Sequence, residues 1–135
     1  MIDLKLTLAR ARAIVKVLRF RDGFVTAVTR DFRTKQVFMV AQQTKRAVLK
    51  TLTTGTMHYW SRSRRKLWLK GERSKHYQRV HDVWVDCDGD ALVFDVEQVG
   101  AACHEGYHSC FYRKLKRGKL VRVLKRKFKP EEIYR

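Results

Sequence analysis

The chain has 135 residues, of which 44% are hydrophobic and only one is proline. This is enough for one domain with a modest core, and it excludes a disordered or collagen-like protein. No run of about 18 apolar residues occurs, so no membrane span is predicted. Residues 1–20 contain Arg10, Arg12 and Lys16 and lack the unbroken apolar core of a secretory signal, so the sequence predicts a cytoplasmic protein.

The charge is strongly basic and unevenly distributed. There are 31 Lys and Arg against 13 Asp and Glu, a formal net charge of +18. Residues 81–110 hold seven acids and no Lys or Arg, so this segment carries −7 and the rest of the chain +25. An acidic segment in a basic chain is expected of a cation site in a protein that attracts phosphorylated ligands or nucleic acid. A solvated basic surface without a partner is the alternative.

Two short helices are predicted. The first extends from Asp3, an N-cap residue type, to about Leu18, with apolar residues at helical spacing. The second covers Thr44 to Leu52, with Thr44 as N-cap and Gly55 as a stop just beyond its end.

The other patterns predict strands, because they are rich in β-branched and aromatic residues between polar turns. The segment 100–106 is predicted to be a loop. Together these elements predict a small, strand-rich α+β domain. The predicted strands cover residues 24–29 and 36–41 as a hairpin, 57–61, 66–69, 77–85 and 91–96 as a second pair, 109–112, and 120–124.

Three aspartates alternate along the turn between the second strand pair. Side chains of alternate residues share one side of an extended chain, so Asp86, Asp88 and Asp90 are predicted to converge on a hard cation such as Mg²⁺ or Ca²⁺. With Glu97 they also match the first, third, fifth and twelfth positions of an EF-hand loop. However, Ala91 replaces the required glycine and the flanks are predicted strands. A solvated acidic turn is the other alternative.

The three cysteines lie within the acidic segment. An odd number without a Cys-x-x-Cys pair argues against a disulfide framework and against a zinc ribbon. Three thiolates from Cys87, Cys103 and Cys110 can hold zinc, with His104 as an optional fourth ligand, and zinc can activate a water at neutral pH. The alternative is that these cysteines are small buried apolar residues.

The segment before the acidic region is predicted to bind an anion. The run SRSRRK at 61–66 offers hydroxyl and guanidinium groups, which suit phosphate. The aromatic side chains Tyr59, Trp60 and Trp68 flank it and can stack on a base. A solvated loop with tryptophans in the core is the alternative.

Several longer motifs occur in order and at consistent spacing. They are HYWSRSR at 58–64, LW at 67–68, GE at 71–72, Ser74, His76, DCDGD at 86–90, ACH at 102–104 and SCFYR at 109–113. Together they resemble the phosphoribosyl-AMP cyclohydrolase family over roughly residues 20–113. On this basis we expect a cyclohydrolase-like domain over residues 1–113, with residues 114–135 as its basic C-terminal extension.

The resemblance implies an enzyme of histidine biosynthesis that opens the adenine ring of phosphoribosyl-AMP between N1 and C6. It implies an intertwined homodimer with active sites at the subunit interface. It further implies zinc held by Cys87 of one subunit with Cys103 and Cys110 of the other, and Mg²⁺ at Asp86, Asp88 and Asp90.

Substrate-binding and catalytic residues are predicted within the same motifs. Either His104 or His76 can move protons, and the sequence does not choose between them. The predicted substrate-binding residues are Trp60, Ser61, Arg62, Ser63, Arg64 and Ser74.

Every predicted metal ligand is kept, whereas several other positions depart from the family's usual pattern. Lys75 replaces a glycine that would permit close backbone approach to a phosphate, and Arg73 adds a second charge nearby. The alternative is therefore a paralogue with weak activity on phosphoribosyl-AMP, acting on another nucleotide or binding nucleic acid through this loop and the basic segment 114–129. The departures are Gln42, Gln43, Thr44, Arg46, Arg73, Lys75 and Glu105.

Overall fold

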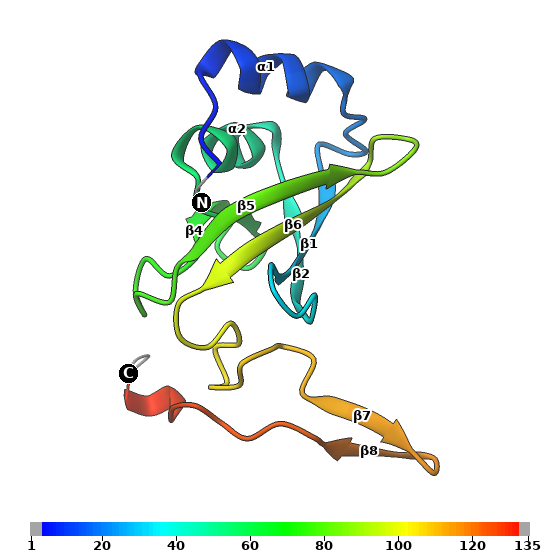
Figure 1. The fold of residues 1–135 in the computed structure, drawn as a ribbon, viewed down its shortest axis with the longest axis vertical. Coiled ribbons are helices and arrows are strands. Elements are labelled where there is room, and N and C mark those ends of the chain that lie inside the picture. Colours follow the sequence, from blue (N-terminus) through cyan, green and yellow to red (C-terminus); the bar gives the residue numbers. More distant parts are fainter. Residues whose placement is uncertain (1–3, 133–135) are drawn as a thin grey trace.

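The computed structural model describes residues 4–132 and has the predicted α+β architecture (Figure 1). Among these residues, no helix is long and apolar enough to cross a membrane. The elements are α1 (Leu8–Val17), β1 (Val25–Asp31), β2 (Val37–Gln43), α2 (Lys45–Thr54), β3 (His58–Ser61), β4 (Lys66–Leu69), β5 (Gln78–Val85), β6 (Ala91–Gln98), β7 (Arg113–Lys116), β8 (Lys119–Arg122) and a 3₁₀ turn, Pro130–Glu132.

A four-stranded sheet in the order β2-β1-β6-β5 forms the centre of the molecule. The β1–β2 and β5–β6 pairs are antiparallel hairpins, and β1 runs parallel to β6. On one face of β6, Leu92, Phe94 and Val96 are buried, as the two-residue period of a strand requires. They join Phe38 and Tyr59 in the core, which lies between this sheet and the helices.

The second helix, α2, forms where its local signals predict. The Thr44 hydroxyl accepts a hydrogen bond from the Ala47 amide at 3.2 Å, which caps the first turn. Gly55 ends the helix in the left-handed conformation, with φ of 78°. A Cβ at this glycine would lie 2.7 Å from the Leu4 carbonyl oxygen, so the close approach of the N-terminal segment also requires glycine.

The first helix begins later than predicted. It starts at Leu8 and is capped by Thr7, whose hydroxyl accepts from the Arg10 amide at 3.3 Å. The predicted cap, Asp3, lies outside the described residues. Residues 4–7 are extended instead, because the Leu4 amide donates to Val80 and the Leu6 amide to Leu52, which draws this segment across the core.

The predicted strand at 109–112 is wrong, and the last hairpin lies further along the chain. Ser109 is buried, and its hydroxyl donates to the Val37 carbonyl at 2.7 Å, while the Cys110 amide donates to Phe38. These bonds tie 109–110 to the edge of β2 without a regular ladder. The chain then forms the antiparallel β7–β8 hairpin (Figure 1). The residues of both strands are all exposed.

Replacing Asp95 with asparagine is expected to lower the free energy of unfolding by about 2–4 kcal/mol at neutral pH. The carboxylate is fully buried, and it accepts hydrogen bonds from Arg30, from Trp84 Nε1 at 2.8 Å and from Lys35 Nζ at 3.4 Å. Burial alone would raise the pKa of Asp95, but the hydrogen bonds from Arg30 and Trp84 and the charges of Arg30 and Lys35 hold it below its usual value.

Because the folded-state pKa of Asp95 is depressed, its contribution is present above the unfolded pKa of about 4 and is lost as pH falls further. Urea unfolding at pH 7 and at pH 3 measures this, and the difference between wild type and Asp95→Asn should shrink at the lower pH. Asp82→Asn, an exposed residue paired with Asp95 across the strands, is the control. Equal stabilities of wild type and Asp95→Asn at pH 7 would contradict this role.

Candidate active site

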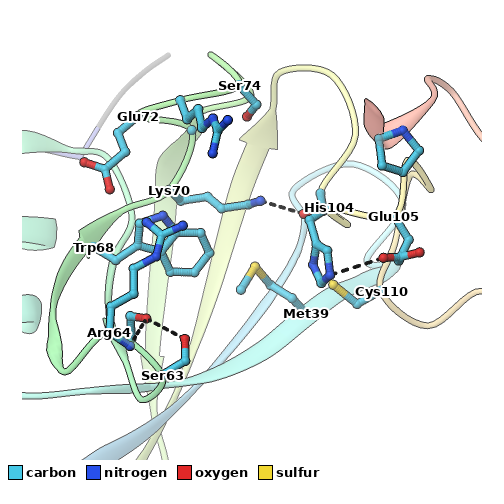
Figure 2. Close-up of a pocket in the computed structure, with 15 residues that line it drawn as sticks. Met39, Ser63, Arg64, Trp68, Lys70, Glu72, Ser74, His104, Glu105 and Cys110 are labelled. Carbon is cyan, nitrogen blue, oxygen red and sulfur yellow. Dashed lines mark hydrogen bonds and ion pairs between the residues drawn. The ribbon is translucent and has the colours of Figure 1, made fainter. Parts of the chain in front are cut away.

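A cavity of about 670 Å³ brings the predicted anion-binding residues together with His104 and one of the thiols (Figure 2). The β3–β4 hairpin and the turn after β4 form one wall, and the loop that follows β6 forms the other. Four predicted substrate-binding residues line it: Ser61, Ser63, Arg64 and Ser74. The Ser61 hydroxyl accepts from the Arg64 amide at 3.3 Å, so the hairpin turn holds its own hydroxyl and guanidinium groups close together.

Two other predicted substrate-binding residues lie elsewhere. Trp60 and Arg62 line a second, smaller cavity of about 360 Å³, together with Gln42 and neighbouring residues of β2. Trp60 precedes Ser61 on β3, and successive side chains of a strand point to opposite faces. The alternation therefore divides the run 60–64 between two surfaces.

Two of the three thiols form a pair in the loop after β6. Cys103 is buried, and its sulfur accepts from the Glu105 amide at 3.4 Å. A hydrogen bond from the Cys110 thiol lowers the pKa of Cys103 to about 6, and the same bond raises the pKa of Cys110. A thiolate at neutral pH is the form that binds a soft metal. The pair therefore has the chemistry of two zinc ligands.

The third thiol, Cys87, is exposed in the turn between β5 and β6. Within the described residues, the only group of three or more possible ligands that lie within reach of one metal ion is Asp86, Asp88 and Asp90. Cys87 therefore does not complete a three-thiol site with Cys103 and Cys110 of its own chain.

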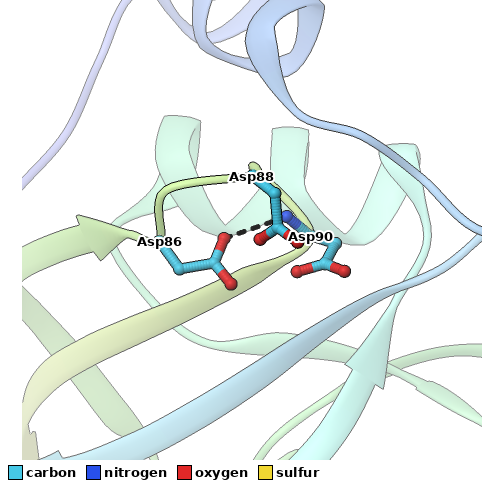
Figure 3. A group of neighbouring side chains, drawn as sticks. All are labelled: Asp86, Asp88 and Asp90. Carbon is cyan, nitrogen blue, oxygen red and sulfur yellow. Dashed lines mark hydrogen bonds between the residues drawn. The ribbon is translucent and has the colours of Figure 1, made fainter.

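The three aspartates converge as predicted (Figure 3). Their ligand oxygens lie within 4.8 Å of one another. Asp86 shapes the turn, because its carboxylate accepts from the Asp90 amide at 3.0 Å and from the Ala91 amide at 3.2 Å. The strands β5 and β6 flank the turn directly, so the EF-hand alternative is excluded.

Positive and negative charge meet at this turn. Hydrogen bonding to Asp90 and Asp86 raises the pKa of Asp88, as expected of crowded carboxylates. Arg21 offsets part of this charge, with its guanidinium 2.9 Å from Asp90 and 3.8 Å from Asp88. The donor set, carboxylate oxygens alone, suits a hard cation such as Mg²⁺.

The two candidate histidines have different surroundings. His104 is 75% exposed, lines the cavity, and places Nε2 3.4 Å from a Glu105 carboxylate oxygen (Figure 2). His76 is not among the described residues that line the cavity. Its ring packs edge-on against Phe128 at 5.1 Å, and burial lowers its pKa.

Sequence reasoning did not select Lys70, which also lines the cavity. It is only 4% exposed, and its Nζ donates to the Ala102 carbonyl at 2.6 Å. The available signal was strand alternation, because Lys70 lies two residues after Trp68 and therefore shares its side of the hairpin.

Some departures from the family pattern have a structural role. Thr44 caps α2, and the buried Gln43 amide donates to the His58 carbonyl at 2.8 Å. Lys75 has a φ of 68°, a conformation that favours glycine. Arg73 lines the cavity beside Ser74 and adds positive charge to it.

Comparisons with known proteins agree with these motifs. The family model described as Phosphoribosyl-AMP cyclohydrolase matches residues 39–112. The phosphoribosyl-AMP cyclohydrolase of Methanothermobacter thermautotrophicus is 57% identical over 119 residues, which are 84% of this chain and 83% of that protein. That of Sulfurisphaera tokodaii is 53% identical over 82% of this chain and 95% of its own length.

A third relative is named as a bifunctional protein. The histidine biosynthesis bifunctional protein HisIE of Thermoanaerobacter pseudethanolicus is 46% identical over 90% of this chain, which corresponds to 56% of that protein. The matched residues include the cavity hairpin, the aspartate turn and the paired thiols. The chain therefore belongs to the phosphoribosyl-AMP cyclohydrolase family.

Proposed function

We propose that the chain hydrolyses the adenine ring of phosphoribosyl-AMP between N1 and C6, a step of histidine biosynthesis, at a zinc site shared between two subunits. The observation that carries this proposal is the cavity itself. It combines hydroxyl and guanidinium groups for a phosphate, an aromatic ring for a base, an exposed histidine and a thiol in one space. No single one of these features would specify a phosphorylated purine.

The hydroxyl-rich turn of the β3–β4 hairpin is assigned to a phosphate group of the substrate. Arg64 can bind a phosphate through two parallel hydrogen bonds, and the hydroxyls of Ser61 and Ser63 lie 3.5 Å apart beside it. Trp68, on the same wall, is assigned to stacking on the adenine. Ser74 is assigned to the substrate's remaining polar groups.

His104 is assigned as the group that moves protons. It lines the cavity with Cys110, and its ring is exposed enough to meet a substrate. A general base must reach the proton that it removes, directly or through one water, and this geometric condition favours His104 over His76. Glu105, at 3.4 Å from the ring, can orient it.

Zinc is assigned to Cys103 and Cys110 of one subunit and Cys87 of the partner subunit. The donor chemistry fits, because the paired thiols already favour a thiolate and three thiolates are a known zinc environment. Bound zinc supplies Lewis acidity, which makes water a competent nucleophile at neutral pH. Mg²⁺ is assigned to Asp86, Asp88 and Asp90.

The intertwined homodimer is proposed on the separation of the thiols. Cys103 and Cys110 lie in the loop after β6, whereas Cys87 lies in the β5–β6 turn. A second copy of the chain can supply the missing thiol. The free energy of zinc binding then becomes part of the free energy of association of the two subunits.

The experiment that tests the function is turnover of phosphoribosyl-AMP by the zinc-loaded protein, followed by ultraviolet absorbance. We expect wild-type turnover on the order of 1–10 per second, with no gain in an Arg73→Thr, Lys75→Gly double variant. Failure of the wild type together with a gain in the double variant would favour the paralogue.

Nucleic-acid binding stays a prediction of the basic surface. The exposed β7–β8 hairpin, residues 113–122, contains six Lys and Arg and no acid. Binding of RNA or DNA should then weaken steeply as salt rises, since each phosphate contact releases counterions. Nucleic-acid binding by the wild type is measured across a salt series, beside its turnover of phosphoribosyl-AMP. The two results together decide whether nucleic-acid binding accompanies the hydrolase activity or replaces it.

A further inference from the structure

Lys70 is a buried cation with no carboxylate partner among residues 4–132. Its side chain lies in the wall of the cavity, with Nζ 5.5 Å from the centre of the Trp68 ring and 2.6 Å from the Ala102 carbonyl oxygen. No ion pair joins it to an acid within the described part of the chain. A buried ammonium is costly unless negative charge lies nearby, so the surroundings of Lys70 should supply that charge.

The paired thiols lie beside Lys70, because Cys110 lines the same cavity and Cys103 directly follows the residue that Lys70 contacts. Burial lowers the pKa of Lys70, and the charges of Cys110 and Cys103 act in the opposite direction. Ala102, whose carbonyl accepts from Lys70, is the residue directly before Cys103, so the ammonium holds the backbone that carries the thiol (Figure 2). Lys70 therefore interacts with this loop in two ways, through a hydrogen bond to its backbone and through the charge of the ammonium group.

We propose that Lys70 is a positioning residue for the thiol pair, which fixes the loop at Ala102 and offsets the charge of Cys103 and Cys110 so that they can hold a divalent metal. This inference rests on the proposed zinc site. Three thiolates with Zn²⁺ carry one net negative charge, and the ammonium of Lys70 would bring the assembly to neutrality. Groups behind the direct ligands commonly tune metal affinity in this way.

The test measures the zinc dissociation constant by competition with a chromophoric chelator. Lys70→Met keeps the apolar stem and removes the charge, and we expect zinc to bind about 10–100-fold more weakly. Lys70→Arg keeps the charge and should recover most of the affinity. Lys66→Met, an exposed lysine on the same hairpin, is the matched control and should bind zinc as the wild type does.

Steady-state kinetics at saturating zinc separates positioning from substrate contact. If Lys70 acts on the thiol pair, KM for phosphoribosyl-AMP should change less than the zinc dissociation constant. Wild-type zinc affinity in Lys70→Met, with or without a raised KM, would overturn the proposal. If Lys70→Met does not fold, Lys70→Gln decides, since it keeps an N–H donor without a charge and should also bind zinc weakly; wild-type affinity there overturns the proposal equally.

Failure of this inference can be distinguished from failure of the zinc site. If zinc binding by the wild type does not depend on Cys103, the zinc site itself is wrong. If it does depend on Cys103 and Lys70→Met binds zinc as tightly as the wild type, only the role of Lys70 is wrong.

Discussion

Replacing Cys103 with serine is expected to remove bound zinc and to lower kcat/KM for phosphoribosyl-AMP by about 10³-fold or more. Cys103 is the thiol that the Cys110 hydrogen bond and the Glu105 amide hold in the thiolate form. Serine keeps the size of the side chain but does not provide a soft anionic ligand. The loss should therefore follow from the donor atom rather than from packing.

Elemental analysis and turnover, measured on the same preparation, check this result. Circular dichroism controls for folding, because Cys103 is buried. Unchanged zinc content in folded Cys103→Ser would remove this residue from the metal site. Zinc lost with full turnover retained would instead show that the reaction does not need the metal.

Replacing His104 with glutamine is expected to lower kcat about 10²–10⁴-fold while zinc content and KM change little. Glutamine can still form hydrogen bonds in the cavity, but it cannot exchange a proton at neutral pH. The ring is exposed and is not needed for the core, so folding should be preserved.

His76→Gln is the matched control for this variant. His76 packs against Phe128, so we expect a change in stability larger than any change in kcat. A larger fall in kcat for His76→Gln than for His104→Gln would show that His76, and not His104, is the group that moves protons. Loss of zinc from the His104→Gln variant would indicate that His104 is a zinc ligand.

Elements with local signals were predictable from the sequence. Thr44 and Gly55 provide a cap and a stop that depend only on their neighbours, and α2 formed between them. The aspartate turn was equally local, because Asp86 closes it with hydrogen bonds to residues four and five positions later. Runs of β-branched and aromatic residues between polar turns predicted both the β1–β2 and the β5–β6 hairpin.

Features that depend on distant residues were not predictable. The parallel pairing of β1 with β6 joins residues more than sixty positions apart, and no local pattern encodes it. Residues 4–7 became extended, and 109–110 irregular, through bonds to distant backbone. Strand alternation places Lys70 on the same side of the hairpin as Trp68, but its hydrogen bond to the Ala102 carbonyl, 32 residues away, has no local signal. The split of Trp60 from Ser61, by contrast, follows from alternation within the predicted strand 57–61.

The shared zinc site is tested most directly by a heterodimer of two inactive variants, Cys87→Ser and Cys103→Ser, isolated through different affinity tags. If each site combines Cys87 of one subunit with Cys103 and Cys110 of the other, one site of the heterodimer carries both substitutions and the other is intact. We therefore expect the heterodimer to show roughly half of the wild-type turnover of phosphoribosyl-AMP, whereas each variant alone stays inactive. A heterodimer as inactive as its parents would contradict the account, because it would mean that each site draws all its thiols from one chain.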